Sequence, residues 1–390
     1  MSRIAVLVSS APRPGLAAAI AAGEAPRRDY FELRDRLNAA LHTPPAAPGR
    51  GYRLAQRAGG HALAMALQAW AQRGSYDVIL TDQEAAGLIL GLLFKFTGTR
   101  RGHVMISHYL SPGKKQPFFR VLRVQTHIDR TICYSSAQQQ VAFHKLGLRP
   151  DQVALVLHPA DSAFWRPAQS AEEAARDVEL LCEVGLDLPP DVPVIASAGL
   201  EFRDYQTLIN AVPHLPAETR VVIAAASPWS KRKNTAEDVP LPANVQRVSL
   251  KPLQLRALYR RARAVALPLF DVDFQAGSLV AYEALACGTP VVITRTRGQL
   301  DIVEEGVTGL YVPPGDTPAM AAALNRLLAD PALAARLGGR ARAVVEDHLN
   351  LDTYLREMVQ VVEDVRAARS QGAPAGSARN PATPPQRRTG

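Results

Sequence analysis

The sequence predicts an α/β protein of two domains, each built on a parallel β-sheet. The chain has 390 residues, which exceeds the usual size of a single hydrophobic core. Short β-branched runs alternate with Ala-, Leu- and Arg-rich stretches of helical period, as in βαβ units. A proline-containing segment from His158 to Pro190 separates this series from a second one. The alternation on both sides of that segment favours two Rossmann-like domains.

The first domain is expected to span residues 1–165. Its strands are predicted at four runs: Ile4–Ser9, Asp77–Thr81, Val104–Ser107 and Thr131–Tyr134. A helix is expected around Tyr52–Ala71, which is apolar on one face. The prolines that follow, from Pro159 to the pair Pro189–Pro190, are unsuited to helices and central strands. They indicate an interdomain linker.

The second domain is expected to span residues 166–350. Strands are predicted at Val194–Ala198, Arg220–Ala225, Val245–Ser249, Ala264–Pro268, Pro290–Thr294 and Gly309–Val312. Helices are predicted at Tyr205–Ala211, Leu253–Ala262, Leu279–Ala286 and Pro318–Leu328, with a further short helix beginning at Leu300–Asp301 and Glu304–Glu305. Apolar residues at helical spacing predict a C-terminal helix over 351–369. The composition of residues 370–390 predicts a disordered tail.

Positive charge is concentrated in the first half of the chain. Residues 1–160 contain 20 Lys and Arg against 9 Asp and Glu, whereas residues 161–369 contain 22 against 27. This asymmetry indicates an anionic partner, such as a phospholipid surface or a phosphorylated acceptor. Free use of Arg by a GC-rich genome explains it equally well. A basic aromatic segment suits peripheral contact with a membrane surface, but a solvated loop leading into a partly buried helix explains it at least as well. Its residues are Lys114, Lys115, Phe118, Phe119, Arg120 and Arg123.

Several classes of protein are disfavoured by what the sequence lacks. No apolar run reaches the ~20 residues that span a bilayer, and the apolar stretch after Arg3 is too brief for a signal peptide. Three cysteines without metal-ligand spacing favour a reducing cytoplasm. No P-loop and no nucleic-acid-binding module are present, so no nucleic acid is expected as a partner.

The most specific stretch for chemistry is Asp271–Gly288, DVDFQAGSLVAYEALACG. A strand is predicted to end at Pro268 and a helix to begin near Ser278. In a parallel sheet this loop borders the ligand crevice, and the amides of the helix N-terminus suit a diphosphate. Glu283 lies just over one turn into the helix, where its carboxylate can accept both hydroxyls of a ribose. Gln275 precedes the helix, where a sugar attached to the diphosphate would lie.

This stretch, with residues Thr294–Asp316, resembles the E-x7-E motif of retaining GT-B glycosyltransferases of the group 1, family 4-like type. The resemblance covers residues 192–345 well and the first half loosely. Glu283 matches the second Glu, which grips the nucleotide ribose in that family. Gln275 stands in place of the first Glu and brings no negative charge. The resemblance implies two sheets facing a central cleft, a C-terminal helix packing back on the N-terminal domain, and retention of anomeric configuration.

Further donor-binding residues follow from the same resemblance. Ser197–Tyr205 resembles the glycine-rich turn of the family, with Arg203 as the phosphate clamp and Gly199 allowing close approach of the backbone. A surface Arg paired with an acid is the alternative. Lys231 is a second candidate cation, or part of a solvated loop, and Gly298 corresponds to a turn that closes over the donor. The remaining predicted donor contacts are Ala276, Gly277, Ser278 and Leu279.

The first domain contributes a predicted acceptor side. His108 ends a strand and resembles the His that the family places near the reacting sugar, where an imidazole can orient or deprotonate a hydroxyl. Ser10, beside Ser9 at the end of the first strand, and Asp82 at the end of another are weaker candidates. His108, Gln275 and Arg203 are therefore the predicted catalytic group.

The predicted function is transfer of a sugar from a UDP- or GDP-sugar to an acceptor hydroxyl of unknown identity. The product would be a polysaccharide, a glycolipid or a small-molecule glycoside. Asp271 and Asp273 form a D-x-D pattern, but they precede a helix that already supplies positive charge, so neither a metal nor another cofactor is expected. A sugar-nucleotide 2-epimerase and a non-catalytic sugar-nucleotide-binding protein are the alternatives.

Overall fold

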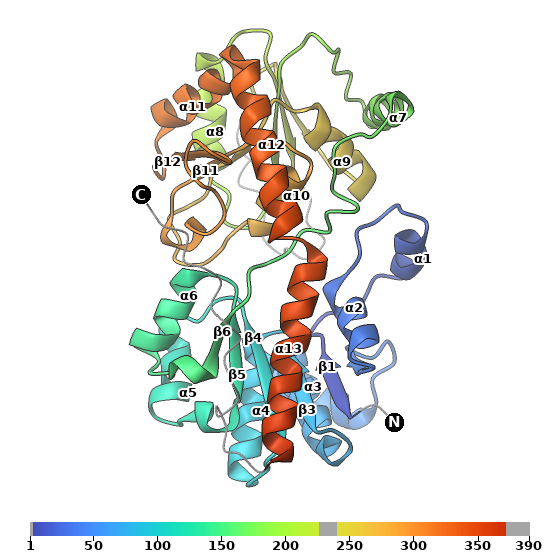
Figure 1. The fold of residues 1–390 in the computed structure, drawn as a ribbon, viewed down its shortest axis with the longest axis vertical. Helices are drawn as coiled ribbons and strands as arrows, with labels where there is room; N and C mark the ends of the chain where they lie inside the picture. The colour runs from blue at the N-terminus through green and yellow to red at the C-terminus, as the bar shows by residue number, and fades with distance from the viewer. Residues whose placement is uncertain (1–2, 226–239, 372–390) are drawn as a thin grey trace. The chain divides into compact units, whose positions relative to one another are not determined.

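The computed structural model describes residues 3–225 and 240–371 (Figure 1). The chain forms two compact units. Unit 1 comprises residues 1–16, 27–157 and 352–390, and unit 2 comprises residues 17–26 and 158–351. The units therefore divide at residues 157 and 351, where the sequence placed the boundaries at 165 and 350. Residues 17–26, which include most of helix α1 (Leu16–Ala21), also group with unit 2.

Unit 1 is built on a six-stranded parallel sheet in the order β2-β1-β3-β4-β5-β6. The strands are β1 (Ile4–Leu7), β2 (Ala40–His42), β3 (Val78–Thr81), β4 (Gly102–Ser107), β5 (Arg130–Cys133) and β6 (Val153–Leu155). Strands β1, β3, β4 and β5 are buried throughout their length and confirm the four predicted ones. The two edge strands β2 and β6 were not predicted, because three residues carry too little pattern.

Helices cover this sheet and complete its core. They are α2 (Asp29–Arg36), α3 (Arg50–Ala71), α4 (Glu84–Phe96), α5 (Gln116–Arg120), α6 (Ser136–Gln140) and α13 (Leu351–Ser370). Helix α3 kinks at Gly59 and Gly60, and its second half packs on α4. Helix α13 buries one apolar face in unit 1, including Tyr354, whose hydroxyl contacts that of Tyr134 at 2.9 Å. The C-terminal helix thus packs on the N-terminal unit, as predicted.

Unit 2 contains a second six-stranded parallel sheet, in the order β12-β11-β10-β7-β8-β9. Its strands are β7 (Val194–Ala198), β8 (Arg220–Ala224), β9 (Val245–Val248), β10 (Ala264–Leu267), β11 (Val291–Thr294) and β12 (Gly309–Val312). Each begins and ends within one residue of its prediction. Three of them, β7, β10 and β11, are buried throughout their length, and such continuous buried runs are typical of a parallel sheet covered on both faces.

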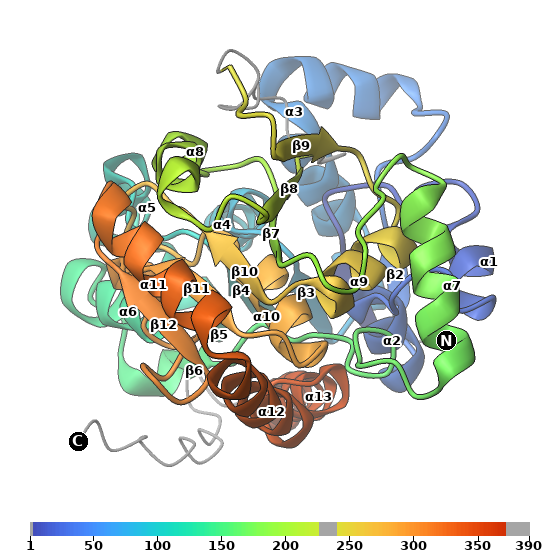
Figure 2. The ribbon, with the colours of Figure 1, turned by 90° about the horizontal axis from the view of Figure 1, so that it is seen from above.

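Helices flank both faces of the second sheet. They are α7 (Ala171–Cys182), α8 (Tyr205–Ala211), α9 (Pro252–Arg261), α10 (Ser278–Ala286), α11 (Thr317–Ala329) and α12 (Pro331–Asp347). Helices α8 and α11 pack together on one face, and α9 and α10 lie on the other (Figure 2). Leu208 of α8 and Leu324 of α11 are both fully buried in the core that they share with the strands.

Two sequence predictions in this unit were wrong. The expected linker contains helix α7, whose first turn is capped by the Ser170 side chain, so the prolines only flank an ordered element. The short helix expected from Leu300 to Glu305 does not form; a single 3-10 turn at Arg297–Gln299 is followed by turns. There the Thr308 hydroxyl accepts the amide of Glu304 at 2.9 Å, and such side-chain bonding competes with a helix.

Candidate functional site

The loop between β10 and α10 is the centre of the predicted donor site. Helix α10 begins at Ser278 directly after Gly277, whose φ of +73° is left-handed. No side chain caps its first turn. The first amides of a helix have no partner within the helix, and they carry a partial positive charge. The start of α10 therefore offers hydrogen-bond donors to an anion.

Arg203 lies beside this helix start. Its side chain is 3% exposed, and it donates from Nε to the carbonyl of Ala198 at 2.9 Å and from Nη1 to that of Glu201 at 3.0 Å. A methyl group added at Gly199 would lie 2.5 Å from Nη2, and one added at Gly277 would lie 2.6 Å from Nη1. The guanidinium is thus held between two glycines. Arg203, Gly199 and Gly277, predicted separately from the sequence, meet at one point.

Backbone contacts bring Arg203 to the loop. The amide of Asp204 donates to the carbonyl of Pro268 at 3.0 Å, and that of Phe270 donates to the carbonyl of Phe202 at 3.1 Å. Backbone hydrogen bonds therefore join the loop after β7 to the loop after β10 at the carboxyl ends of these neighbouring strands. Burial lowers the pKa of the Arg203 guanidinium. An anion in contact with the guanidinium would raise this pKa again, because it stabilises the charged form.

Gly298 packs against the backbone of the loop between β10 and α10. A methyl group at this position would lie 2.0 Å from the carbonyl oxygen of Phe274, so the two backbones are in direct contact. The neighbouring Gln299 is fully buried and donates from Nε2 to the carbonyl of Ala276 at 2.7 Å. The hydroxyl of Tyr311 in turn donates to the Gln299 carbonyl at 2.6 Å. Sequence reasoning missed Gln299, although its place beside Gly298 could have indicated it.

Gln275 lies in this supported loop with its side-chain amide unsatisfied. Both Nε2 and Oε1 are buried and have no hydrogen-bond partner in the described structure, and the same holds for Oγ1 of Thr296. Leaving a buried polar group unpaired costs about 1–3 kcal/mol, and native proteins avoid this unless a ligand or water satisfies the group. The amide of Gln275 is therefore a candidate for contact with a hydroxylated ligand.

Glu283 is half-buried on α10 and accepts a hydrogen bond from the hydroxyl of Tyr259 at 3.4 Å. Tyr259 is fully buried, and its pKa is raised by burial and then by the charge of Glu283, while Arg203 acts on it in the opposite direction. The charges of both predicted donor residues, Glu283 and Arg203, thus act on the pKa of Tyr259. The Leu279 side chain is 46% exposed, so only its backbone belongs to the helix start. Lys231 lies outside the described residues.

In unit 1, side chains gather at the carboxyl ends of three strands. Asp82 follows β3 and accepts hydrogen bonds from the amide and hydroxyl of Ser9 at 3.0 and 2.9 Å. His108 follows β4, and its Nε2 lies 2.9 Å from the carbonyl of Asp82. Burial raises the pKa of Asp82 to about 6. The predicted residues Asp82 and His108 are thus in contact, whereas Ser10 makes no side-chain hydrogen bond within the described residues.

The loop that carries His108 is held by a buried carboxylate. Glu84, the first residue of α4, accepts the amides of His108 and Tyr109 at 3.2 and 3.1 Å. It also pairs with the ammonium of Lys115 at 2.5 Å. The Lys115 charge lowers the pKa of Glu84, although burial opposes this. Glu84 was missed because no sequence pattern links it to a loop more than twenty residues away.

The predicted basic aromatic segment is only partly exposed. Phe119 is fully buried and Lys115 is occupied by Glu84, so these two residues do not form a surface. Phe96 and Val121 are the most exposed apolar residues described in this part of unit 1, at 74% and 75%, and Leu122 is 36% exposed. No helix in the described part of the chain is long and apolar enough to cross a bilayer.

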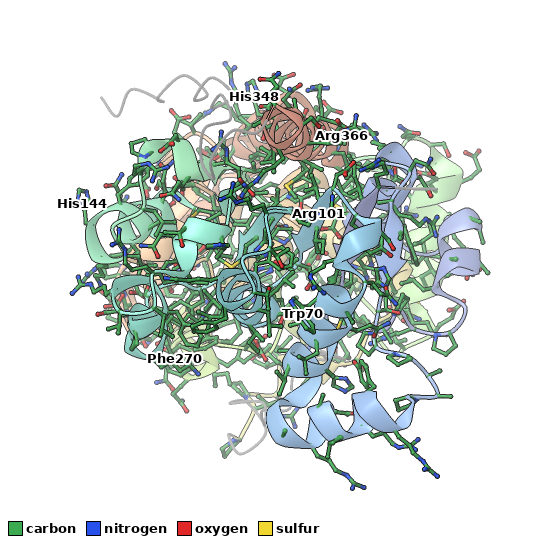
Figure 3. All side chains as sticks on the ribbon, turned by 90° about the horizontal axis from the view of Figure 1, so that it is seen from below. Trp70, Arg101, His144, Phe270, His348 and Arg366 are labelled. Carbon is green, nitrogen blue, oxygen red and sulfur yellow. The ribbon has the colours of Figure 1, made fainter. Side chains whose placement is uncertain are left out.

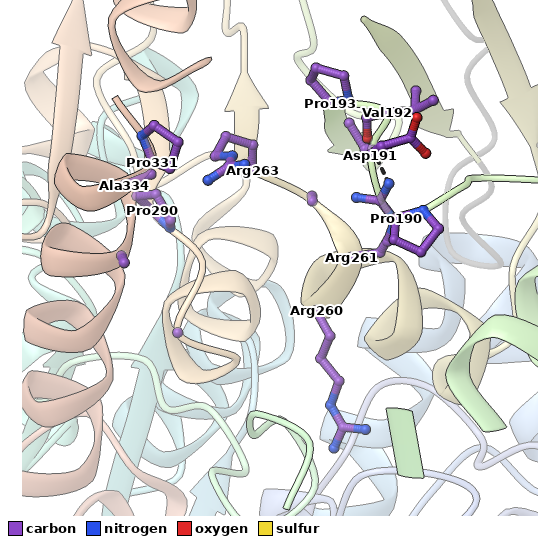
Figure 4. Close-up of a pocket in the computed structure, with 14 residues that line it drawn as sticks. Pro190, Asp191, Val192, Pro193, Arg260, Arg261, Arg263, Pro290, Pro331 and Ala334 are labelled. Carbon is purple, nitrogen blue, oxygen red and sulfur yellow. Dashed lines mark hydrogen bonds between the residues drawn. The ribbon is translucent and has the colours of Figure 1, made fainter. Parts of the chain in front are cut away.

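Unit 2 also contains a basic region, and its arginines have a structural role. A pocket of 280 Å³ is lined by Arg260, Arg261 and Arg263 at the amino-terminal edge of the sheet (Figure 4). Arg260 pairs with Asp177 of α7 at 2.9 Å, and Arg261 donates to the carbonyl of Val192 at 2.6 Å. These two arginines fix the segment that leads into β7. The pocket lies away from the α10 start, at the opposite edge of the sheet.

Residues 189–344 match the family model described as glycosyl transferases group 1. A D-inositol 3-phosphate glycosyltransferase of Actinosynnema mirum is 30% identical over 295 residues, which cover 69% of this chain and 68% of that protein. The protein of the same name from Xylanimonas cellulosilytica is 31% identical over 246 residues, or 60% of this chain and 58% of that protein. For five such relatives, this chain spans only 49% to 64% of their length.

Solved structures share the fold over nearly the whole chain. The Anabaena protein HepE, in complex with UDP and glucose, superposes with a TM-score of 0.67 at 18% identity, covering 93% of this chain and 99% of that one. Sucrose-phosphate synthase from Thermosynechococcus elongatus superposes with a TM-score of 0.69 at 20% identity, covering 94% and 99%. At these identities the likeness shows the fold alone, which is the GT-B fold.

Proposed function

Because this chain belongs to the group 1 glycosyltransferases, we propose that it transfers a sugar from a nucleoside diphosphate donor to an acceptor hydroxyl. One observation carries the proposal: the buried guanidinium of Arg203 lies between Gly199 and Gly277, beside the uncapped start of α10. A buried cation and free helix amides at one point are suited to a diphosphate. The same groups suit the leaving group of a glycosyl transfer.

In this proposal the donor site acts on the diphosphate as it leaves. Negative charge grows on the diphosphate when the glycosidic bond breaks. The amides of Ser278 and Leu279, together with Arg203, would stabilise that charge without rearranging, because the protein already holds them in place. Such preorganised donors commonly contribute ~3 kcal/mol each. Lys231 is proposed as a further cation at the same group.

Two side chains would select the rest of the donor. The carboxylate of Glu283 can accept both ribose hydroxyls, with Tyr259 fixing one of its oxygens. The amide of Gln275, which has no partner among residues 3–225 and 240–371, would donate to and accept from hydroxyls of the sugar. A neutral amide in place of a carboxylate favours a sugar that offers an acceptor as well as a donor.

Unit 1 would hold the acceptor. His108 and Asp82 lie together at the carboxyl ends of β4 and β3, and His108 can orient or deprotonate an acceptor hydroxyl. Retention of configuration follows from the E-x7-E resemblance. Chemistry without a metal or another cofactor is part of the same proposal.

The names and bound ligands of similar proteins suggest which substrates to test first. HepE has been solved with UDP-glucose, and a trehalose-6-phosphate protein of E. coli with UDP-2-fluoro glucose. UDP-glucose is therefore the first donor to test, followed by GDP-sugars. The relatives named for D-inositol 3-phosphate suggest a phosphorylated polyol as the first acceptor. An anionic acceptor of this kind also suits the basic first half of the chain.

We further propose that the protein works in the cytoplasm and contacts the membrane surface peripherally. The support is the pair Phe96 and Val121, which are largely exposed in a part of unit 1 that also carries Lys95 and Arg123. Exposed apolar side chains among cations are typical of membrane-surface contact. Cosedimentation with anionic vesicles tests this, and a Phe96→Ser/Val121→Ser variant that still sediments equally well would contradict it.

A donor panel tests the proposed activity. The purified protein is incubated with UDP-, GDP- and ADP-sugars, and free nucleoside diphosphate is measured without and with acceptors. We expect slow hydrolysis of one donor class and faster release with a suitable acceptor. An epimerised donor would indicate the 2-epimerase, and binding without turnover would indicate the non-catalytic alternative.

Matched variants locate the activity. Glu283→Ala is expected to weaken nucleotide binding at least tenfold, because a charged hydrogen-bond acceptor is worth about 1.5–3 kcal/mol. Glu179→Ala removes a carboxylate whose pair with Arg176 is exposed, and serves as the control. Equal nucleotide affinity in both variants would remove Glu283 from the donor site.

A further inference from the structure

Unit 1 contains a pocket of 570 Å³ that is lined almost entirely by arginines. We call it the arginine pocket, and its lining residues are Arg3, Asp77, Arg100, Arg101, Arg366, Arg369 and Ser370. Arg3 directly precedes β1, and Arg100–Arg101 directly precede β4. Arg366 and Arg369 come from the end of α13. Figure 3 labels Arg101 and Arg366, one from each of these two parts of the chain.

Ordered backbone positions these cations. The amide of Asp77 donates to the carbonyl of Arg3 at 2.6 Å, and the amide of Gly102 donates to the carbonyl of Asp77 at 2.7 Å. A methyl group at Gly102 would lie 3.0 Å from Val365 of α13, so the helix packs directly on the strand start. The arginines therefore lie next to the starts of strands and on a packed helix, and not in long loops.

The nearby carboxylates do not balance the charge. Asp77 contacts Arg3 and lies 3.5 Å from Arg101, Glu363 pairs with Arg366 at 2.7 Å, and Asp129 pairs with Arg369 at 3.0 Å. Three acids thus face five arginines, which leaves an excess of two positive charges. The pKa of nearby His127 is lowered by burial and, after that, by Lys95, Arg369 and Arg100. The positive potential therefore extends beyond the pocket lining.

We propose that the arginine pocket binds an oligophosphate anion, a ligand with two or more adjacent phosphate groups. Guanidinium groups bind phosphate oxygens with paired N–H donors, and several converging on one pocket match adjacent phosphates. Residues 372–390 contain three Arg and no Asp or Glu, so their side chains carry no negative charge that could neutralise the pocket.

This site is separate from the proposed catalytic residues of the same unit. Arg101 precedes β4 and His108 follows it, and the six residues of that strand span roughly 20 Å at ~3.3 Å each. The arginine pocket lies at the amino-terminal edge of the sheet, and His108 lies at the carboxyl edge. Ligand binding in the pocket is therefore expected without any donor present.

Calorimetric titration with inorganic tripolyphosphate tests the proposal. The full chain is compared with Arg100→Ala/Arg101→Ala and with Arg336→Ala/Arg340→Ala. The second variant removes the same charge from exposed positions of α12 in unit 2, and so controls for net charge. The proposed donor site can also bind phosphates. The arginine pocket is therefore identified by the tripolyphosphate binding that Arg100→Ala/Arg101→Ala loses and Arg336→Ala/Arg340→Ala keeps.

We expect saturable binding that weakens at least about tenfold in Arg100→Ala/Arg101→Ala, the loss of one or more charged hydrogen bonds. It should stay within about twofold in the control. Donor hydrolysis should be the same in all three proteins. Equal tripolyphosphate affinity in the first variant, or no saturable binding to the wild type, would overturn the proposal. Cosedimentation with phosphatidylcholine vesicles, with and without polyprenyl diphosphate, distinguishes a lipid headgroup from a free oligophosphate.

Discussion

Substitution of Gly298 by Ala should disrupt the donor loop and destabilise unit 2. The added methyl group would lie 2.0 Å from the Phe274 carbonyl oxygen, whereas ordinary contact begins at 3.4 Å, so the two backbones must separate by about 1.4 Å (3.4 minus 2.0). A shift of that size would also break the hydrogen bond from Gln299 to Ala276, now 2.7 Å long. Overpacking costs about 1–3 kcal/mol and a lost hydrogen bond about 1 kcal/mol.

The total of about 2–4 kcal/mol corresponds to a fall in Tm of roughly 5–15 °C for a unit of this size. Thermal unfolding followed by circular dichroism measures it, and calorimetry with the nucleotide of the preferred donor measures binding, which should weaken more than tenfold. Gly339→Ala is the control, because a methyl group there meets open space in α12 and should stabilise the helix by up to about 1 kcal/mol. An unchanged Tm and nucleotide affinity in Gly298→Ala would refute this account of the loop.

Three further predictions follow from buried contacts. Burial raises the pKa of Asp82 from the usual 3.8 to about 6, so its contribution to stability is complete below pH 3.8 and is lost as the pH rises through 6. Between pH 4 and pH 7 the free energy of unfolding of the wild type, measured in urea, should fall by up to about 3 kcal/mol relative to that of Asp82→Asn. If the free energies of both proteins changed in parallel with pH, this prediction would be contradicted. Glu84→Ala should cost about 3–5 kcal/mol, because it leaves Lys115 unpaired in a buried site, and an effect as small as that of the exposed Glu179→Ala would contradict the buried pair. Gly338→Ala should lower the Tm where Gly339→Ala does not, since its methyl group would lie 1.9 Å from the carbonyl oxygen of Gly288; equal Tm values would show that α12 can shift.

Ten of the twelve strands in the described residues were predictable, because most of them contain runs of buried apolar residues. All four residues of Val291–Thr294 are buried, and such a run has one favourable state in a parallel sheet. The start of α10 was predictable for a similar reason, since Gly277 and the apolar helix after it follow one another in the chain. Local pattern failed where a contact redirected the backbone, as when Thr308 bonds the amide of Glu304. It failed also at the short edge strands.

The two parallel sheets, the helix start at Ser278 and the residue types suited to a diphosphate could be read from the chain, because they depend on residues that are neighbours in it. The contact between Arg203 and Gly277 could not, because it depends on backbone hydrogen bonds between two loops more than sixty residues apart. The same is true of Glu84, which holds the His108 loop, and of the arginines that α13 adds to those of the β4 start. Contacts between distant segments depend on strand order and on helix packing, and neither is written in a local pattern.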